Sequence, residues 1–154
     1  MRSTLLFALI LLLLPVSALA VLPTGRQARV PASFSVARSL LSASSSPGNA
    51  YVAGASVVIT APVSGDLSAA GGSVITAAPV GGDGLLVAGS ISSRARVAGD
   101  FRALGWNINI EEPIAGDLVA SGYSVYDAGR AGGSVFIIAA NTTLANGASG
   151  SVTI

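Results

Sequence analysis

Four aspartates that recur at a fixed interval are the residues of this chain whose spacing could support chemistry. They follow glycines at intervals of 17 residues: Asp66, Asp83, Asp100 and Asp117. If the chain coils with the same period, their carboxylates form one file with a spacing of about 4.8 Å. The file could bind Ca²⁺, but this ion takes six or more oxygens from several directions, and no second acidic column is present. We therefore expect no metal, and expect each aspartate to close an Asx-turn onto nearby amides after a glycine with positive φ.

The chain has few residues suited to acid–base or nucleophilic catalysis. It contains no His, Cys or Lys, and its hydroxyl groups have no base beside them. A polysaccharide lyase pairs calcium-binding acids with a basic residue, and in the repeats only arginines could serve: Arg94, Arg96, Arg102 and Arg130. The sequence therefore predicts a protein that is not an enzyme and that carries no cofactor.

Two pairs of side chains have the same 17-residue separation. Arg94 and Glu111 are expected to form an ion pair between neighbouring turns. Trp106 and Tyr123 are expected to stack, and stacked rings on a surface could hold a sugar ring, although a packing role is the simpler interpretation. Asp127 falls in an inward-facing column, so we expect the fifth repeat to be distorted there.

A repeat of 17 residues organises the part of the chain that carries these side chains. Seven glycines mark it without interruption: Gly48, Gly65, Gly82, Gly99, Gly116, Gly133 and Gly150. A short fixed period is typical of a solenoid, whose units bury their apolar side against their neighbours. Residues 48–154 should therefore form six turns plus a partial seventh.

Each repeat contains three short stretches in which apolar residues alternate with others. Positions three and five are apolar, as in Leu67 and Ala69, and so are positions ten, twelve and sixteen, as in Val57, Ile59 and Val63. A period of two indicates strands, and the Gly-rich and Ala-Pro segments indicate corners, which would also break helices. We predict an all-β fold, a single-stranded parallel β-helix with three short strands per 17-residue turn. A left-handed hexapeptide β-helix is disfavoured because 17 is not a multiple of six.

A degenerate motif recurs within the repeats. The pattern G-D-L-x-A-x-G-x-S-V-x-I, followed by a P-V/I-x-G-D return, covers residues 65–83 and again 99–117. Through this motif, residues 48–154 resemble the bactofilin family of polymer-forming cytoskeletal proteins. The resemblance implies a right-handed β-helix that joins end to end into filaments without nucleotide and often lies at the membrane as a scaffold for envelope enzymes. Bactofilins are typically cytoplasmic, so an exported chain would be an extracytoplasmic relative.

The segment before the repeats has two parts. Residues 1–20 have the features of a secretory signal peptide: Arg2, the apolar run LLFALILLLL, Pro15, and small residues at Ala18 and Ala20. The run is too short to span a bilayer, which favours cleavage over an uncleaved anchor. We expect an exported protein that is periplasmic, cell-envelope-associated or extracellular, and that meets the membrane only if the signal is retained.

Residues 21–47 are rich in Ser, Arg and Pro and are expected to be a linker with an N-terminal cap. Its apolar residues could form a strand or a short helix that covers the first turn: Phe34, Val36, Leu40 and Leu41.

The charge balance and the rod shape limit the functions that fit. A net charge of +1 argues against nucleic-acid binding. The leading hypothesis is a non-enzymatic structural protein of the cell envelope that self-assembles through its coil ends, with envelope proteins or cell-wall glycan as further partners. The alternative is a secreted, monomeric β-solenoid that acts as an adhesin or glycan-binding module.

The candidate assembly surface lies at the C-terminal end of the rod. It comprises Val135, Phe136, Ile138, Val152 and Ile154. Phe136 and Ile138 are predicted to face outward, where exposure to water forgoes about 1.5 to 3 kcal/mol each. Either another subunit covers them or residues 21–47 fold back over them.

Overall fold

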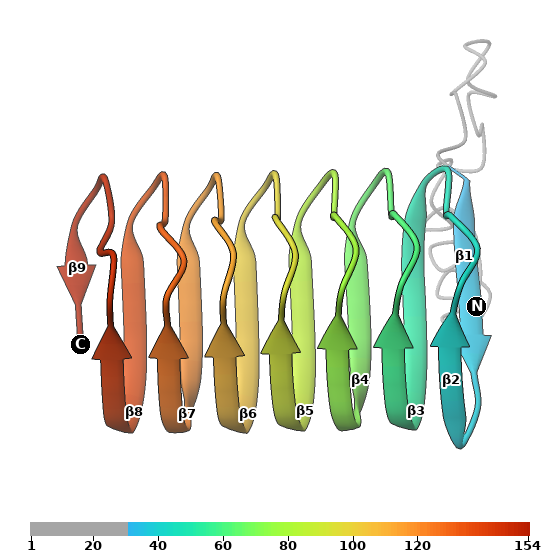
Figure 1. Ribbon diagram of the computed structural model, residues 1–154, viewed down its shortest axis with the longest axis horizontal. Helices are drawn as coiled ribbons and strands as arrows, with labels where there is room; N and C mark the ends of the chain where they lie inside the picture. The colour runs from blue at the N-terminus through green and yellow to red at the C-terminus, as the bar shows by residue number, and fades with distance from the viewer. Residues whose placement is uncertain (1–30) are drawn as a thin grey trace, which may run out of the picture.

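A right-handed coil of parallel β-strands makes up residues 31–154, the part of the chain that the computed structural model describes (Figure 1). The strands are β1 (Ala32–Val36), β2 (Ser39–Ser42), β3 (Asn49–Ile59), β4 (Leu67–Thr76), β5 (Gly84–Ser93), β6 (Phe101–Ile110), β7 (Leu118–Asp127), β8 (Val135–Leu144) and β9 (Val152–Thr153). Within this range no helix is long and apolar enough to cross a membrane. The signal peptide expected at residues 1–20 lies outside the described residues.

Every strand pairing joins residues that are 17 apart. Ala50 pairs with Leu67, Leu67 with Gly84, and Gly84 with Phe101. The strands follow one another along the coil from β3 to β9, and β1 and β2 both pair with β3. Because the register never shifts, each position of the repeat becomes a straight row of side chains along the rod. The predicted fold class, an all-β parallel β-helix with 17 residues per turn, is confirmed.

Each turn has three sides but only one long strand. A strand such as β4 bends in the middle, where Gly71 pairs with Gly54 and residue 72 is skipped, so that one strand covers two sides. The third side is held by a single bridging residue per turn, and Val63, Val80 and Val97 pair in succession along this row. The prediction of three short strands per turn is therefore corrected. The bend keeps its strand pairing because a Cβ at Gly71 would overlap the carbonyl oxygen of Gly54, and glycine leaves that space free.

Of residues 21–47, expected to be a linker and cap, residues 32–47 form a further turn of the coil, and residues 21–30 lie outside the described residues. β1 pairs with residues 49–53 and β2 with residues 56–59, in the same 17-residue register. Three inward-facing positions of this turn carry hydroxyl side chains: Ser33, Ser35 and Ser42. This turn lies at the end of the rod opposite to β8, so residues 32–47 do not fold back over Phe136 (Figure 1).

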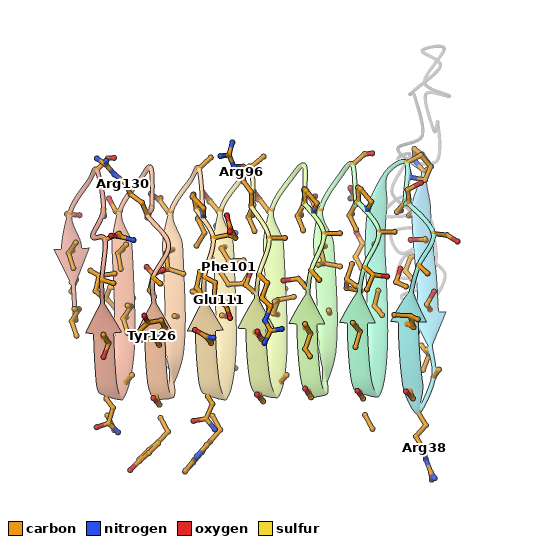
Figure 2. The ribbon with its side chains drawn as sticks, viewed as in Figure 1. Arg38, Arg96, Phe101, Glu111, Tyr126 and Arg130 are labelled. Carbon is orange, nitrogen blue, oxygen red and sulfur yellow. The ribbon has the colours of Figure 1, made fainter. Side chains whose placement is uncertain are left out.

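Aliphatic side chains fill the inside of the coil. The fully buried ones include Ile59, Leu67, Leu86, Ile91 and Ile110. Phe101 is the largest of the fully buried side chains and lies inside the coil, whereas Arg38, Arg96 and Arg130 project from its corners (Figure 2). The Phe101 ring occupies space above Gly84, where a Cβ would lie 2.7 Å from its Cδ2. One large side chain thus fills the gap that the glycine leaves in the previous turn.

Candidate functional site

The repeated aspartates form a hydrogen-bonded ladder along one corner of the coil. The backbone N–H of Asp83 donates to Oδ1 of Asp66 at 2.9 Å, and the same bond joins Asp100 to Asp83 and Asp117 to Asp100. Asn49 begins the ladder by accepting from the N–H of Asp66. The predicted Asx-turns within each turn are wrong, because each side chain instead accepts a bond from the following turn.

Glycine precedes each aspartate because the backbone approaches its neighbour closely. Gly147, outside these corners, is the one glycine of residues 31–154 with positive φ. A Cβ at Gly82 would overlap Oδ1 of Asp66, and the other ladder glycines meet the preceding Asx oxygen in the same way: Gly65, Gly99, Gly116 and Gly133. At the two ends of the repeat, Gly48 meets the Pro31 carbonyl and Gly150 meets the Ser134 hydroxyl. The prediction of positive φ at these glycines is wrong. Glycine is needed there because a side chain would overlap atoms of the preceding turn.

Within residues 31–154 the aspartate file provides no cluster for a metal. No group of three or more His, Cys, Asp or Glu is arranged to hold an ion there. One oxygen of each ladder aspartate already accepts a backbone hydrogen bond. The Arg102 guanidinium lies 3.0 Å from Oδ2 of Asp100 and 3.9 Å from Oδ2 of Asp83. The corner therefore acts as a structural ladder that fixes the register of successive turns.

Asp127 is the one charged side chain buried in the core of residues 31–154. Its Oδ1 accepts the N–H of Gly129 at 2.9 Å, and its Oδ2 has no hydrogen-bond partner in the described part of the chain. Burial raises the pKa of Asp127 to about 6, and the bond from Gly129 only partly opposes this effect. Strand pairing continues from Ile110 through Asp127 to Leu144. The strand pairing is therefore not distorted at this position, contrary to expectation. The Asp127 carboxyl fits because it accepts a hydrogen bond from the backbone N–H of Gly129, two residues further along the chain.

Replacing Asp127 with Asn should stabilise the protein by about 3 kcal/mol at pH 7 and change little at pH 4. The folded-state pKa of about 6 lies above the ordinary aspartate value of 3.8, so the folded protein binds this proton more tightly than the unfolded chain does. Stability from this group is fully present below pH 4 and is lost as the pH rises to about 6. Urea unfolding at several pH values measures the effect, with Asp117→Asn as an exposed control. An identical pH profile for wild type and Asp127→Asn would contradict the assignment.

Both predicted contacts between neighbouring turns are confirmed. Nε of Arg94 lies 3.3 Å from Oε1 of Glu111, and both side chains are exposed, so this ion pair contributes at most about 1 kcal/mol. The rings of Trp106 and Tyr123 stack with centroids 4.8 Å apart and an angle of 8° between their planes. Sequence reasoning missed a second stack, between Phe34 and Tyr51, although these residues are also 17 apart.

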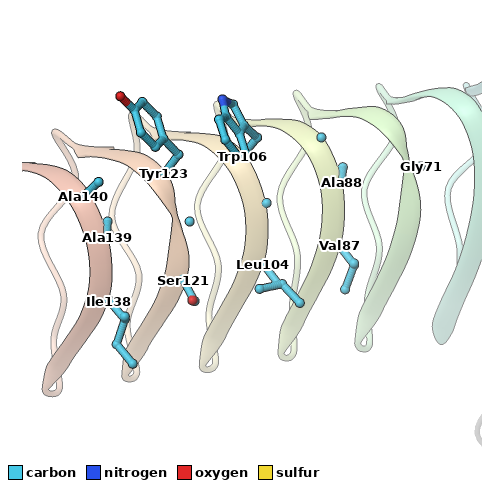
Figure 3. Close-up of a pocket in the computed structure, with 13 residues that line it drawn as sticks. Gly71, Val87, Ala88, Leu104, Trp106, Ser121, Tyr123, Ile138, Ala139 and Ala140 are labelled. Carbon is cyan, nitrogen blue, oxygen red and sulfur yellow. The ribbon is translucent and has the colours of Figure 1, made fainter.

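Trp106 and Tyr123 form a wall of a shallow groove on the outside of the coil (Figure 3). The groove has a volume of about 710 Å³, and small residues such as Gly105 and Gly122 lie along it. Leu104 of β6 and Ile138 of β8 project beside this wall (Figure 3). The groove is mainly apolar, and the indole of Trp106 is 63% exposed.

A second hollow of about 260 Å³ lies on the first half of the strands, nearer the N-terminal end. Large side chains surround it, including Phe34, Tyr51 and Leu85. Its lining also includes the small residues Ser68 and Ala70 of β4. Val87 lines both hollows and therefore joins them into one surface.

The two hollows belong to one apolar face that runs along the rod. We define the apolar face as the outward rows at positions four, six and eight of the repeat. It contains every exposed large apolar side chain of residues 31–154 except Leu41, Tyr126, Val152 and Ile154. The members are Phe34, Tyr51, Leu85, Val119 and Phe136 at position four, Val36, Val87, Leu104 and Ile138 at position six, and Trp106 and Tyr123 at position eight. The predicted patch at Phe136 and Ile138 is thus one end of a surface that runs from β1 to β8, with small residues at these positions in the β4 turn.

The C-terminal end of the described coil exposes residues of the core rows. Val135 and Ile137 are each 1% exposed, whereas Val152 and Ile154, at the same positions of the next turn, are 44% and 67% exposed. β9 pairs only with Val135 and Phe136 of β8. Val135 therefore belongs to the core, and its assignment to the candidate assembly surface is wrong, while Phe136, Ile138, Val152 and Ile154 are accessible.

Compared with known proteins, the chain matches no family model, no curated protein and no solved structure. The described residues offer a register ladder, an apolar side and an apolar end.

Proposed function

We propose that this protein is a non-enzymatic structural protein of the cell envelope that assembles into filaments through the ends of its coil, as an exported relative of the bactofilin family. The supporting observation is the exposure of Val152 and Ile154 in rows that are buried in the preceding turns. Covering each of them with another subunit would contribute about 1.5 to 3 kcal/mol. The edge of β8 beyond Phe136 also pairs with no described strand, and such an edge is a template for strand addition.

The two ends of the rod differ in polarity. The first turn places Ser33 and Ser35 at the inward positions that Val152 and Ile154 occupy at the other end. Serine side chains expose little apolar surface at the N-terminal end. The exposed apolar side chains of the inward rows therefore lie at the C-terminal end, at Val152 and Ile154. The partner is a second copy of this chain, and envelope proteins or cell-wall glycan are further partners in the assembled state.

Negative-stain electron microscopy of purified residues 21–154 tests this function. We expect filaments without added nucleotide or metal, because the interface consists of apolar side chains and backbone edges. Only single rods over a broad concentration range would rule the function out.

Glycan binding by a secreted monomer is the second candidate function, and the groove beside Trp106 favours it. Stacked, exposed aromatic rings offer an apolar surface with a polar edge, which suits a sugar ring. This candidate would replace the first if microscopy showed only single rods and Trp106→Ala abolished binding to insoluble cell-wall glycan.

A further inference from the structure

Each of the two aromatic stacks leaves one ring face uncovered, and the two uncovered faces look toward each other along the rod. Phe34 covers one face of Tyr51, so the other face of Tyr51 is directed at the β4 turn. Tyr123 covers one face of Trp106, so the other face of Trp106 is directed at the β5 turn. Figure 3 shows Ala88 of β5 on the side of Trp106 opposite to Tyr123. The β4 and β5 turns therefore lie between two aromatic walls.

Small residues keep the space between these walls open. At position four, Ser68 lies between Tyr51 and Leu85, and at position eight two consecutive glycines precede Trp106. The walls are three turns apart, about 14 Å, and positions four and eight are separated by about 13 Å along the strands. This space comprises the 260 Å³ hollow and the adjoining part of the groove. We define the trough as the outward surface of the β4 and β5 turns from position four to position eight.

Hydrogen-bonding side chains lie at both ends of the trough. Asp66 lies two positions before the end at position four, and it forms no ion pair within residues 31–154. Ser73 and Ser90 directly follow the two glycines at the other end. Between these ends the floor is apolar and includes Ala70 and Val87. The trough therefore combines aromatic walls and an apolar floor with hydrogen-bonding groups at its two ends.

We propose that the trough binds a neutral glycan that crosses the rod over the β4 and β5 turns. One sugar ring packs with its apolar face on Trp106, above Gly89, and another packs on Tyr51, above Ser68. Sugar hydroxyls donate to the Asp66 carboxylate at one end and exchange hydrogen bonds with the serine hydroxyls at the other. Such binding rests on the second candidate function, glycan binding, and adds the face of Trp106 that is used, the course of the glycan and its charge class.

The charges around the trough favour a neutral ligand. Among residues 31–154, no charged side chain lines either hollow. Arg102, in the next turn, is held by Asp83 and Asp100, and the carboxylate of Asp66 would repel an acidic sugar or a lipid phosphate.

The mixture of apolar and polar surface favours a sugar over a lipid chain. A sugar has apolar C–H faces and hydroxyl edges, which match the aromatic walls and the polar ends of the trough. A lipid chain would match the floor alone, and the hydroxyls of Ser73 and Ser90 would lose water without gaining hydrogen bonds.

Tryptophan fluorescence of the full chain reports on the trough directly, because Trp106 is the only tryptophan of the sequence. The probes are the neutral oligosaccharides cellohexaose, chitohexaose and mannohexaose, with hexagalacturonate as the acidic counterpart. We expect a saturable change in emission with at least one neutral probe and none with hexagalacturonate. A larger change with hexagalacturonate would overturn the proposal, and so would a change with phosphatidylcholine vesicles, which would favour a lipid surface.

Ser68→Leu with Ala70→Val tests whether the ligand lies in the trough. This variant gives the β4 turn the side chains that the β5 turn carries at the same positions, so its melting temperature should be kept. Because the new side chains fill the trough, we expect the dissociation constant to rise at least about 10-fold. Ser92→Leu with Ala77→Val makes the same two exchanges on another side of the rod and should leave the dissociation constant unchanged.

Tyr51→Ala removes the second aromatic wall and leaves the fluorescent side chain in place. We expect binding to weaken about 2- to 10-fold, as for the loss of one aromatic contact. Wild-type affinity in both Tyr51→Ala and the variant with the filled trough would overturn the proposal.

Calorimetry of Trp106→Ala separates this outcome from failure of glycan binding as such. Loss of binding in Trp106→Ala alone would leave glycan binding standing at another part of the groove. Absence of binding by every neutral probe would remove both the trough site and glycan binding. Filament formation, observed by microscopy without sugar, is independent of either result.

Discussion

Filaments should disappear while the folded rod remains when Val152 and Ile154 are both replaced with aspartate. The two side chains are exposed in the single rod, so their replacement should leave the melting temperature nearly unchanged. In a filament the same positions would be buried, and burying an unpaired carboxylate costs several kcal/mol. Negative-stain microscopy reports assembly, and thermal unfolding by circular dichroism reports the fold.

A matched control adds the same two charges to the same turn, facing outward. Ser151→Asp with Thr153→Asp places aspartate at position two, which the ladder aspartates occupy in earlier turns, and at an outward position beside Val152. This variant should still form filaments. If both double variants lost assembly equally, charge near the end would explain the result and a buried apolar contact would not.

Phe101→Ala should lower the free energy of unfolding by about 3 to 5 kcal/mol. Phe101 is 1% exposed and is the largest side chain of the core, and rigid turns on both sides limit collapse around the cavity. Urea unfolding measures the loss.

The glycine beneath this ring provides a specific second test. Gly84→Ala should destabilise the wild type, because its Cβ would lie 2.7 Å from the Phe101 ring. In the Phe101→Leu background the same change should cost much less, because Leu118 and Leu67 show that leucine fits this row. Additive effects of the two substitutions would show that the ring does not fill the space at Gly84.

The sequence predicted the coil because the period is strict. Ala50, Leu67, Gly84 and Phe101 share one row in the structure, as the 17-residue spacing requires. The same spacing correctly predicted the contacts of Arg94 with Glu111 and of Trp106 with Tyr123.

Two features were not predicted from the sequence: the turn at residues 32–47 and the hydrogen-bond partners of the ladder aspartates. The turn at residues 32–47 was missed because Pro31 replaces the marker glycine and serines replace apolar residues in its inward rows. The partner of the Asp66 carboxylate was assigned to its own turn, because a one-dimensional pattern does not distinguish a local amide from one that is 17 residues away. The similarity of the segment Ser39–Leu41 to Ser56–Val58, 17 residues later, was a signal for the extra turn.

The direction of the aspartate ladder coincides with the direction of protein synthesis. In each bond the acceptor oxygen belongs to the earlier turn and the donor N–H to the later one, as in Asp66 and Asp83. At about 5 to 20 residues per second, a ribosome adds one turn in roughly one to three seconds. Each emerging turn therefore meets an acceptor that is already in place, and the rod can lengthen in register as the chain is made.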